Sequence, residues 1–357
     1  MEPKKVLVGM SGGTDSSVAC IELLQQGYQV QGVTMVMWTK PSDGLTPTYV
    51  LEAQQLAAAL GIPHYVLDVS EQFRNCVVDN FMSEYMCGRT PNPCVQCNMH
   101  IKMKFLLQEA DRLGCDYVAT GHYAQVFRHN ATFYIAKGFD VRKDQSYFLW
   151  GLKQDVLSRL LLPLGGMTKD EVRSVAMQHG FVSVAQKPES QDICFVEGDY
   201  RDFLRAHKPD IDVVVGKGDF INPDGKVLGK HKGFPFYTIG QRKGLEIALG
   251  VPAYVLQINA EKNQIMIGDK NQLLTSDMYI RDCYFPSCSS LSDNEVLLIK
   301  IRYKSMPVQG YLVEWSDTHA HIRFTAPVEA LTPGQSAVLY RNECVVGGGI
   351  IYSHSCL

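Results

Sequence analysis

Three features of the sequence predict an α/β fold in which a doubly wound parallel sheet is followed by two small all-β domains. The chain has 357 residues, which is enough for two or three domains. Its first third alternates short Val- and Ile-rich segments with helical patterns, as parallel sheets with crossover helices do. From Ile211 onward, short Val, Ile and Tyr segments are separated by turn sequences, which indicates antiparallel β-structure.

The strands and helices expected in the first third follow one another closely. The apolar, β-branched segment 4–10 predicts the first strand, and a loop rich in Gly and Ser leads from it into a helix. Gly27, Gly61 and Gly114 follow three helical patterns, where glycine suits the left-handed conformation of a helix C-cap. The segments predicted as strands are 4–10, 29–37, 64–69 and 116–120, and those predicted as helices are 17–26, 49–60 and 102–113.

The segment 152–207 is predicted to be mainly helical. Thr168 and Glu171 have the spacing of a capping box, in which each side chain accepts from the other residue's backbone amide. Turn sequences punctuate the β-rich remainder, and we expect a break between two small barrels near 275–281. The predicted domains are therefore 1–207, 208–277 and 278–357.

The composition is that of a globular protein with little net charge. The formal net charge is −3, so any contact with a nucleic acid must come from local basic patches. No apolar segment approaches the roughly 18 residues of a membrane span, and the N-terminus lacks the pattern of a signal peptide. The eleven cysteines are scattered, unlike a disulfide framework. We expect a cytoplasmic monomer that does not associate with membranes.

The loop Ser11-Gly12-Gly13-Thr14-Asp15-Ser16 stands between the first strand and the first helix. Its glycines permit positive φ and let backbone N–H groups approach an anion, and the following helix directs its positive end to the same place. Ser11 and Ser16 add hydroxyl groups, and Asp15 can hold Mg²⁺ or order the loop. No Walker A sequence occurs in the chain. An ordinary glycine-rich turn is the alternative, and we interpret the loop as a nucleotide site.

Two segments place cysteines in polar surroundings. Cys94 and Cys97 have C-x-x-C spacing in a proline-containing loop, just before a helix expected to begin near Ile101. A helix N-terminus stabilises a thiolate and so raises its reactivity. Cys194 lies in the polar segment 189–195.

Three interpretations of these cysteines are open. In a sulfur-transfer pair, one thiol carries a persulfide and a second releases its sulfur by disulfide exchange. A structural zinc site needs four ligands; Cys87 is a fourth candidate, but a second C-x-x-C is missing. The third interpretation is that they are ordinary buried thiols. We interpret the remaining cysteines in this way: Cys20, Cys76, Cys115, Cys283, Cys288, Cys344 and Cys356.

The loop 11–16 resembles the signature of the PP-loop ATP pyrophosphatases, which split ATP into AMP and pyrophosphate while adenylating an oxygen. With the cysteine segments added, the chain is similar over essentially its whole length to the bacterial tRNA-specific 2-thiouridylase (MnmA) family. The loop alone indicates only the superfamily, whereas the cysteine segments and 143–149 make the resemblance specific. The segments that carry it are 11–17, 92–93, 97–98, 119–123, 143–149, 187–195, 240–245 and 302–303.

The resemblance implies a sulfurtransferase that uses ATP to replace the C2 oxygen of the wobble uridine in tRNAs for Lys, Glu and Gln. Cys194 would receive a persulfide from a donor protein, and Cys97 would be the nucleophile that completes sulfur release. Many members of the family have Asp where this chain has Cys94, so the acid–base or positioning role of that Asp is in doubt here. An alternative hypothesis is a [4Fe–4S] cluster held by Cys94, Cys97 and Cys194.

Two other functions stay open: a PP-loop ligase or amidating synthetase acting on a small molecule, and a non-catalytic RNA-binding relative. The segment 226–243 combines Lys and Arg with Phe234, Phe236 and Tyr237, which suits phosphate and stacking contacts; a solvated hairpin with core aromatics is the alternative. Residues expected to bind ATP and Mg²⁺ are Gly9, Met10, Ser11, Gly12, Gly13, Thr14, Asp15, Ser16, Met35 and Gly121. Residues expected to contact RNA are Asn92, Pro93, Cys94, His122, Lys143, Asp144, Gln145, Arg302, Tyr303 and Gln335.

Overall fold

The computed structural model describes residues 3–38, 46–186, 193–247, 250–286, 291–292 and 294–352. The segment 187–192, Cys288 and Cys356, about which the sequence made predictions, lie outside the described residues. The chain divides into two compact units. The first comprises Met1–Val77, Cys94–Gln191 and Glu343–Val346, and the second comprises Val78–Pro93, Asp192–Asn342 and Gly347–Leu357.

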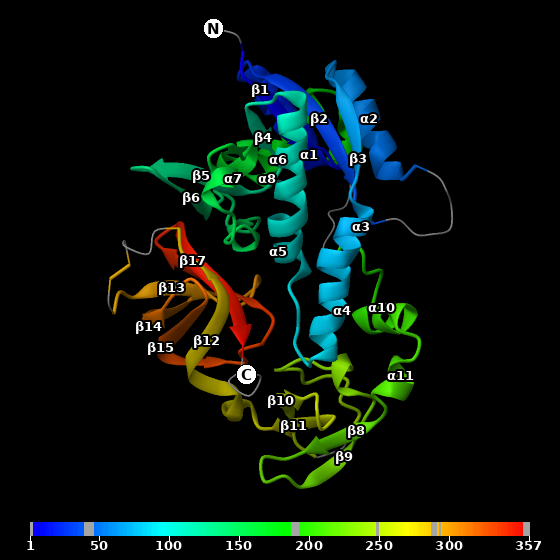
Figure 1. Cartoon of the computed structure of the whole chain (residues 1–357), viewed down its shortest axis with the longest axis vertical. Helices are drawn as coiled ribbons and strands as arrows, with labels where there is room; N and C mark the ends of the chain where they lie inside the picture. The colour runs from blue at the N-terminus through cyan, green and yellow to red at the C-terminus, as the bar shows by residue number, and fades with distance from the viewer. Residues whose placement is uncertain are drawn as a thin grey trace. The chain divides into compact units, whose positions relative to one another are not determined.

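A five-stranded parallel sheet forms the centre of the first unit. Its strands lie in the order β3-β2-β1-β4-β7, and every neighbouring pair is parallel. Figure 1 shows β1, β2 and β3 side by side. The predicted doubly wound parallel sheet is confirmed. The strands are β1 (Lys5–Gly9), β2 (Gln29–Val36), β3 (His64–Asp68), β4 (Tyr117–Ala119) and β7 (Leu160–Leu161).

Helices cover both faces of this sheet. Val6 and Val8 of β1 are fully buried in a cluster with side chains of α1 (Thr14–Gln25), α2 (Thr48–Leu60) and α8 (Lys169–Gln178). Leu7 points to the opposite face because side chains alternate along a strand. Helix α6 (Met103–Leu113) contacts β1 and β4 and buries Leu106. The helix at residue 168 starts with the predicted capping box of Thr168 and Glu171.

Two helices begin earlier than the sequence suggested. Helix α1 starts at Thr14 rather than at residue 17, so half of the glycine-rich loop belongs to its first turn. The helix expected near Ile101 starts at Pro93 and continues through a π-helical turn into α6. The other elements of the first unit are α3 (Ser70–Phe73), α5 (Pro93–Cys97), β5 (Ala124–His129), β6 (Thr132–Lys137), α7 (Gln154–Leu157) and α9 (Val182–Ala185).

The second unit is mainly β-structure, as predicted. One sheet has four strands in the order β10-β11-β8-β9. In the other, β12 (Leu274–Tyr284) pairs with both β15 and β17, so this sheet closes on itself. The remaining elements are α4 (Asp79–Met86), α10 (Tyr200–His207), α11 (Ile211–Val214), β8 (Gly218–Ile221), β9 (Val227–His231), β10 (Tyr254–Asn259), β11 (Gln264–Gly268), β13 (Leu297–Lys300), β14 (Val308–Trp315), β15 (His319–Glu329), β16 (Ser336–Arg341) and β17 (Cys344–Tyr352).

Two details of the second unit differ from expectation. Strand β12 runs without interruption through 275–281, where we expected a break between the two β domains. The short helix α11 lies in a segment expected to hold strands only.

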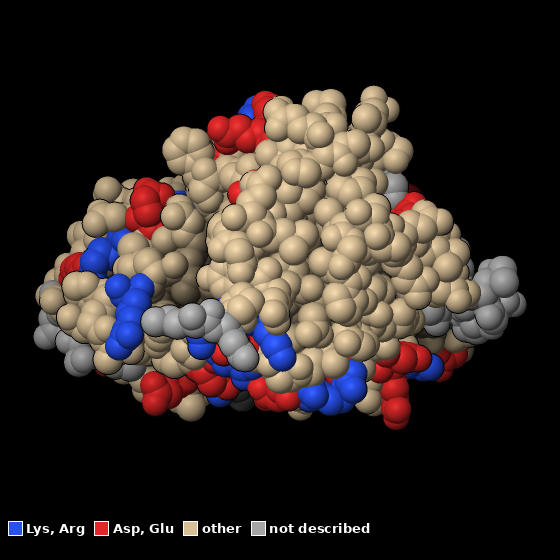
Figure 2. Space-filling model, turned by 90° about the horizontal axis from the view of Figure 1, so that it is seen from above, with Lys and Arg blue, Asp and Glu red and all other residues tan. Residues whose placement is uncertain are grey.

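Charge is mixed rather than segregated on the surface shown in Figure 2. A broad area without Lys, Arg, Asp or Glu is bordered by groups of both signs. This agrees with the small net charge of the chain. Within the described ranges, no helix is both long enough and apolar enough to span a membrane.

Candidate nucleotide site and reactive cysteines

The glycine-rich loop has a backbone shape that only glycine fits at one position. Gly12 has φ of +68°, and a Cβ atom there would lie 2.8 Å from the carbonyl oxygen of Tyr49. Both facts require glycine, because positive φ and a backbone contact this close exclude a side chain. The Ser16 hydroxyl accepts a hydrogen bond from the Ser11 amide at 3.2 Å, which closes the loop.

The first turn of α1 presents its amide groups to this loop without a competing cap. Its N-cap residue is Gly13, and no side chain caps the helix. The free amides and the helix dipole together favour an anion at this point. The hydroxyls of Ser16 and Ser17 donate to the Gly13 carbonyl at 3.1 and 2.8 Å, so they shape the turn as well as adding polarity to the site.

Asp15 is held in place by two side chains that the sequence did not indicate. Its Oδ1 accepts hydrogen bonds from the Tyr123 hydroxyl at 2.7 Å and from the Lys169 ammonium at 2.6 Å. The Lys169 side chain is only 7% exposed. Of the two roles expected for Asp15, these contacts support ordering of the loop. Lys169 lies 154 residues along the chain, so no local pattern could reveal it.

The loops after β1 and β4 meet at the carboxyl edge of the sheet. A Cβ atom on Gly121 would lie 2.8 Å from the backbone of Asp15, so the two loops pack in direct contact. This is the point where an open α/β sheet binds its ligand, because the strand order reverses there. Met35 lies near the end of β2 at 9% exposure. Met10 is buried and its sulfur packs against Gly32, so its side chain is part of the core.

Cys97 lies at the same edge of the sheet. Its Sγ is 3.9 Å from the Sδ of Met37, directly after β2, and the residue is 6% exposed. Cys94 is half-buried. Because the helix begins at Pro93, both thiols lie within it rather than preceding it, Cys94 in its first turn and Cys97 as its fifth residue. This corrects the expected start near Ile101 and places Cys94 near the positive end of the helix.

Cys194 belongs to the second unit and is exposed. Its meeting with Cys97 therefore stays a prediction. Within the described part of the chain, no group of three or more His, Cys, Asp or Glu side chains is arranged to hold a metal ion.

The other cysteines only partly match their interpretation as buried thiols. Cys20, Cys115 and Cys283 are buried. Burial raises the pKa of the Cys20 and Cys283 thiols to about 12, which makes them unreactive. Cys76 is exposed, so its interpretation as buried was wrong, and Cys344 is half-buried.

Comparison with known proteins decides the family. Three family models match in succession: a tRNA methyl transferase HUP domain at residues 4–198, a tRNA methyl transferase PRC-barrel domain at 201–269, and an aminomethyltransferase beta-barrel domain at 277–351. The tRNA-specific 2-thiouridylase MnmA 3 of Phocaeicola vulgatus is 50% identical over 355 residues, covering 98% of this chain and 95% of the relative. MnmA of Amoebophilus asiaticus is 43% identical over 361 residues, covering 98% and 96%.

The chain belongs to the tRNA-specific 2-thiouridylase (MnmA) family. The domain models carry the words methyl transferase in their descriptions, whereas these relatives match the chain from end to end and are named as thiouridylases. The resemblance inferred from the sequence is confirmed.

Three residues that the MnmA resemblance assigned to RNA contacts lie in the first unit as a loop, Lys143-Asp144-Gln145. Asp144 is 6% exposed, and its carboxylate accepts from the amides of Gly138 and Ser146 at 3.1 Å. Gln145 accepts from the Tyr123 amide at 2.9 Å. The side chains of Asp144 and Gln145 therefore hold the loop in shape. The side chain of Lys143 is half-buried.

His122 lies in the loop after β4, next to Gly121, which packs against the nucleotide loop. Its Nδ1 lies 2.7 Å from the Thr120 hydroxyl. Desolvation, aided by Lys102, lowers the pKa of the His122 imidazole to about 3. It is therefore neutral at pH 7 and acts as a hydrogen-bonding group rather than a cation.

The remaining residues assigned by the MnmA resemblance lie in the second unit: Asn92 and Pro93 end its segment Val78–Pro93, and Arg302, Tyr303 and Gln335 lie in its segment Asp192–Asn342. Gln335 donates to the carbonyls of Thr90 and Pro91, both at 3.0 Å, and so holds the segment that leads to Asn92 and Pro93. Arg302 donates to the Ala330 carbonyl and the Thr332 hydroxyl, and Lys300 lies 5.5 Å from the Tyr303 ring centroid. Gln335 thus holds the segment that precedes the predicted reactive cysteines.

Proposed function

We propose that this chain is an ATP-dependent sulfurtransferase that converts the wobble uridine of tRNA to 2-thiouridine. Membership of the MnmA family supports the activity. The observation that carries the proposal is the position of Cys97, which lies beside the end of β2 at the edge where the phosphate loop opens. A nucleophilic thiol and a phosphate site at one sheet edge suit a reaction that needs both.

The proposed reaction starts by giving the uridine oxygen a good leaving group. The C2 oxygen attacks the α-phosphorus of ATP, pyrophosphate leaves, and the amides of the loop stabilise the charge on the departing phosphates. The terminal sulfur of a Cys194 persulfide then adds at C2 and AMP departs. Attack of the Cys97 thiolate on the Cys194 sulfur breaks the S–S bond, frees the 2-thiouridine and leaves a Cys97–Cys194 disulfide for an external dithiol to reduce.

A second order of steps uses the same residues. Cys97 attacks the persulfide first and releases hydrosulfide, which then displaces AMP from C2. In both orders, the target base has to leave its stack, and bringing ATP, base and sulfur together supplies much of the rate.

Mg²⁺ would accompany ATP and offset the charge of its phosphates. Asp15 is the acidic side chain of the loop, and its contacts with Tyr123 and Lys169 favour a role in loop order.

A [4Fe–4S] cluster on Cys94, Cys97 and Cys194 is the competing proposal for the sulfur chemistry, favoured by the two thiols on one helical turn. Anaerobic purification with iron and sulfide analysis separates the two, because a colourless, iron-free and fully active protein excludes the cluster.

The finer features of this proposal concern partners and organisation. We propose tRNAs for Lys, Glu and Gln as substrates, a persulfide-carrying protein as the sulfur donor, and a cytoplasmic monomer of three domains, 1–207, 208–277 and 278–357. Strand β12, Leu274–Tyr284, crosses the proposed boundary at 277.

Mass spectrometry of tRNA nucleosides from cells that lack this protein tests the function directly. We expect 2-thiolation of wobble uridine to disappear in those three tRNAs, and unchanged thiolation would contradict the proposal. Pyrophosphate release with the purified protein distinguishes the other candidates. Release that needs tRNA supports the thiouridylase, release without tRNA supports a small-molecule ligase, and no release supports a non-catalytic RNA-binding protein.

A further inference from the structure

The second unit contains a pocket lined mainly by cations. Its cavity volume is about 890 Å³. Six Lys and Arg side chains line it, against one acidic residue, Glu246, in a chain whose net charge is −3. We call it the cation pocket. Its basic residues are Arg201, Arg205, Lys232, Arg242, Lys243 and Arg302.

One turn of this pocket is fixed rigidly. The Gln241 side chain accepts from the Thr238 amide at 3.1 Å and donates to the Lys243 carbonyl at 2.9 Å, which ties both ends of the turn together. Two backbone hydrogen bonds to Val255, at 2.8 and 2.9 Å, attach the same turn to β10. Gly240, with φ of +83°, would place a Cβ atom 2.9 Å from Ala330. The turn therefore presents its two exposed cations, Arg242 and Lys243, from a preorganised backbone.

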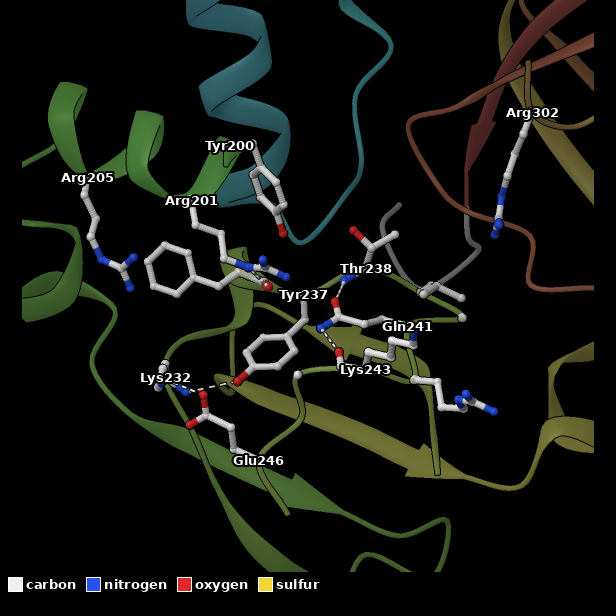
Figure 3. Close-up of a pocket in the computed structure, with 15 residues that line it drawn as sticks. Tyr200, Arg201, Arg205, Lys232, Tyr237, Thr238, Gln241, Lys243, Glu246 and Arg302 are labelled. Atoms are coloured by element: carbon white, nitrogen blue, oxygen red, sulfur yellow. Dashed lines mark hydrogen bonds and ion pairs between the residues drawn. The ribbon is translucent and has the colours of Figure 1, made fainter. Parts of the chain in front are cut away.

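Helix α10 brings two arginines to the same cavity. Figure 3 shows Tyr200 and Arg201 pointing toward the turn that carries Thr238 and Gln241. The guanidinium of Arg205 lies 4.3 Å from the Phe236 ring centroid, and that of Arg201 lies 5.1 Å from the Tyr200 ring. Contacts with aromatic faces hold these flat groups in fixed orientations.

The cations of the pocket are not equally available. Arg201 pairs with Asp199, Arg205 with Asp212, and Lys232 with Glu246. Neither Arg242 nor Lys243 forms an ion pair with any described residue. The excess positive charge is thus concentrated at the tip of the turn.

The aromatic residues of the pocket indicate which part of a ligand it takes. Phe236 and Tyr237 are 3% and 5% exposed, so their rings belong to the core and offer no face for stacking a base. The expected stacking role of these aromatics, and of Phe234 at 5% exposure, was therefore wrong. What the pocket offers is a concave set of N–H donors, which matches phosphate oxygens.

We propose that the cation pocket binds backbone phosphates of the tRNA, separately from the phosphates of ATP on the loop of α1. Six cations against one acidic residue favour an extended polyanion, and an acidic protein surface is the competing occupant that the experiment below distinguishes. The inference rests on the proposed function only in naming the RNA as tRNA.

The test compares two double variants of the full chain that remove the same charge. In the pocket pair, Arg242→Gln is combined with Lys243→Gln. In the control pair, Lys217→Gln is combined with Lys262→Gln, which are exposed lysines of the same unit outside both the pocket and the segment 226–243. The dissociation constant for an unmodified tRNA transcript is measured across a series of salt concentrations, with ATP affinity in the absence of tRNA and thermal unfolding as checks on folding.

We expect the pocket pair to raise the tRNA Kd by roughly tenfold at low salt. A plot of the logarithm of Kd against the logarithm of the salt concentration should also become less steep, by about one unit of slope for each phosphate that the variant no longer neutralises. The control pair should change Kd by less than about twofold, because screened charges outside the RNA-binding surface contribute little. Equal weakening by both pairs would overturn the proposal.

Three further outcomes are decisive. If the wild-type protein binds tRNA through the pocket and forms no 2-thiouridine, the proposed function fails and the pocket proposal stands. If the pocket pair binds tRNA normally but no longer accepts sulfur from a persulfide donor, a protein occupies the pocket and our proposal is wrong. If the pocket pair loses saturable binding of inorganic pyrophosphate while its tRNA Kd is unchanged, the pocket takes a free anion, which also overturns the proposal.

Discussion

The nucleotide loop and the cation pocket are both suited to phosphate, and they are built in opposite ways. The loop uses backbone amides at the start of α1 and is formed by consecutive residues after β1. The pocket uses long side chains from α10, from Lys232 directly after β9 and from the turn at residue 241, together with Arg302. Backbone amides fix a short anion at one point, whereas several side-chain cations around a cavity suit an extended polyanion. The two regions should therefore respond differently to substitution and to salt.

The largest expected effect concerns the thiol beside the nucleotide loop. Cys97→Ser and Cys194→Ser should each lower 2-thiouridine formation by more than roughly a thousandfold, because a hydroxyl cannot carry or exchange sulfane sulfur. The measurement is nucleoside mass spectrometry after a single-turnover reaction with tRNA, ATP and persulfide donor.

The matched control for these variants is Cys76→Ser, which changes an exposed thiol of the first unit. Cys20→Ser is a poorer control, because Cys20 is fully buried and the new hydroxyl would need a partner. Retained thiolation in Cys97→Ser would remove the nucleophile from the mechanism.

The next effect separates backbone from side-chain recognition. Gly12→Ala should weaken ATP binding by roughly tenfold or more, since positive φ and a 2.8 Å contact with Tyr49 force the loop to move. Calorimetry with ATP gives the affinity. The tRNA Kd of this variant, measured without ATP, should stay within about twofold of wild type, because cations of the pocket do not depend on the loop.

A variant that lost tRNA and ATP affinity together would show that the two regions are coupled. Gly13→Ala provides a comparison for stability, because Gly13 has no positive φ and its nearest contact would be 3.5 Å. We expect a smaller drop in thermal stability than for Gly12→Ala.

A moderate effect is expected at the buried cation of the loop. Lys169→Met leaves Asp15 with Tyr123 as its remaining partner in this network. We expect the free energy of unfolding to fall by roughly 1–2 kcal/mol. A fully buried carboxylate would cost more, but Asp15 is partly exposed and solvent screens its charge. Urea unfolding of the full chain measures this change. The double variant Lys169→Met with Asp15→Asn identifies the cause. If it is more stable than Lys169→Met alone, the lost stability came from the unpaired carboxylate of Asp15. If the stability changes of the two single variants simply add, the two side chains act independently.

The smallest structural perturbation is a change of salt alone. Raising NaCl from about 50 to 200 mM should weaken tRNA binding by roughly a hundredfold or more, while ATP binding weakens only a few-fold. Parallel titrations of the two ligands check this contrast. Equal salt dependence would mean that the pocket and the loop recognise phosphate by the same means.

Local sequence was a good guide where neighbouring residues make the structure. The strand, glycine turn and helix from Lys5 to Gln25 follow from hydrophobic pattern and glycine chemistry, and the Thr168 capping box was found from its spacing. It was a poor guide to burial in the segment 226–243. Phe234, Phe236 and Tyr237 looked able to stack on bases, but they are buried, in a segment that packs against α4, Arg205 and Phe220.

The sequence by itself determined the parallel-sheet fold, and it predicted the phosphate loop and which thiols react. Each of these depends on interactions between residues close in the chain or on residue types with distinctive chemistry. Only the tertiary structure decided that Lys169 and Tyr123 bind Asp15, that Gln335 holds the segment before Asn92, and that six cations share one pocket. These contacts join residues up to 245 positions apart, and no local pattern encodes such a distance because the intervening chain has to fold first.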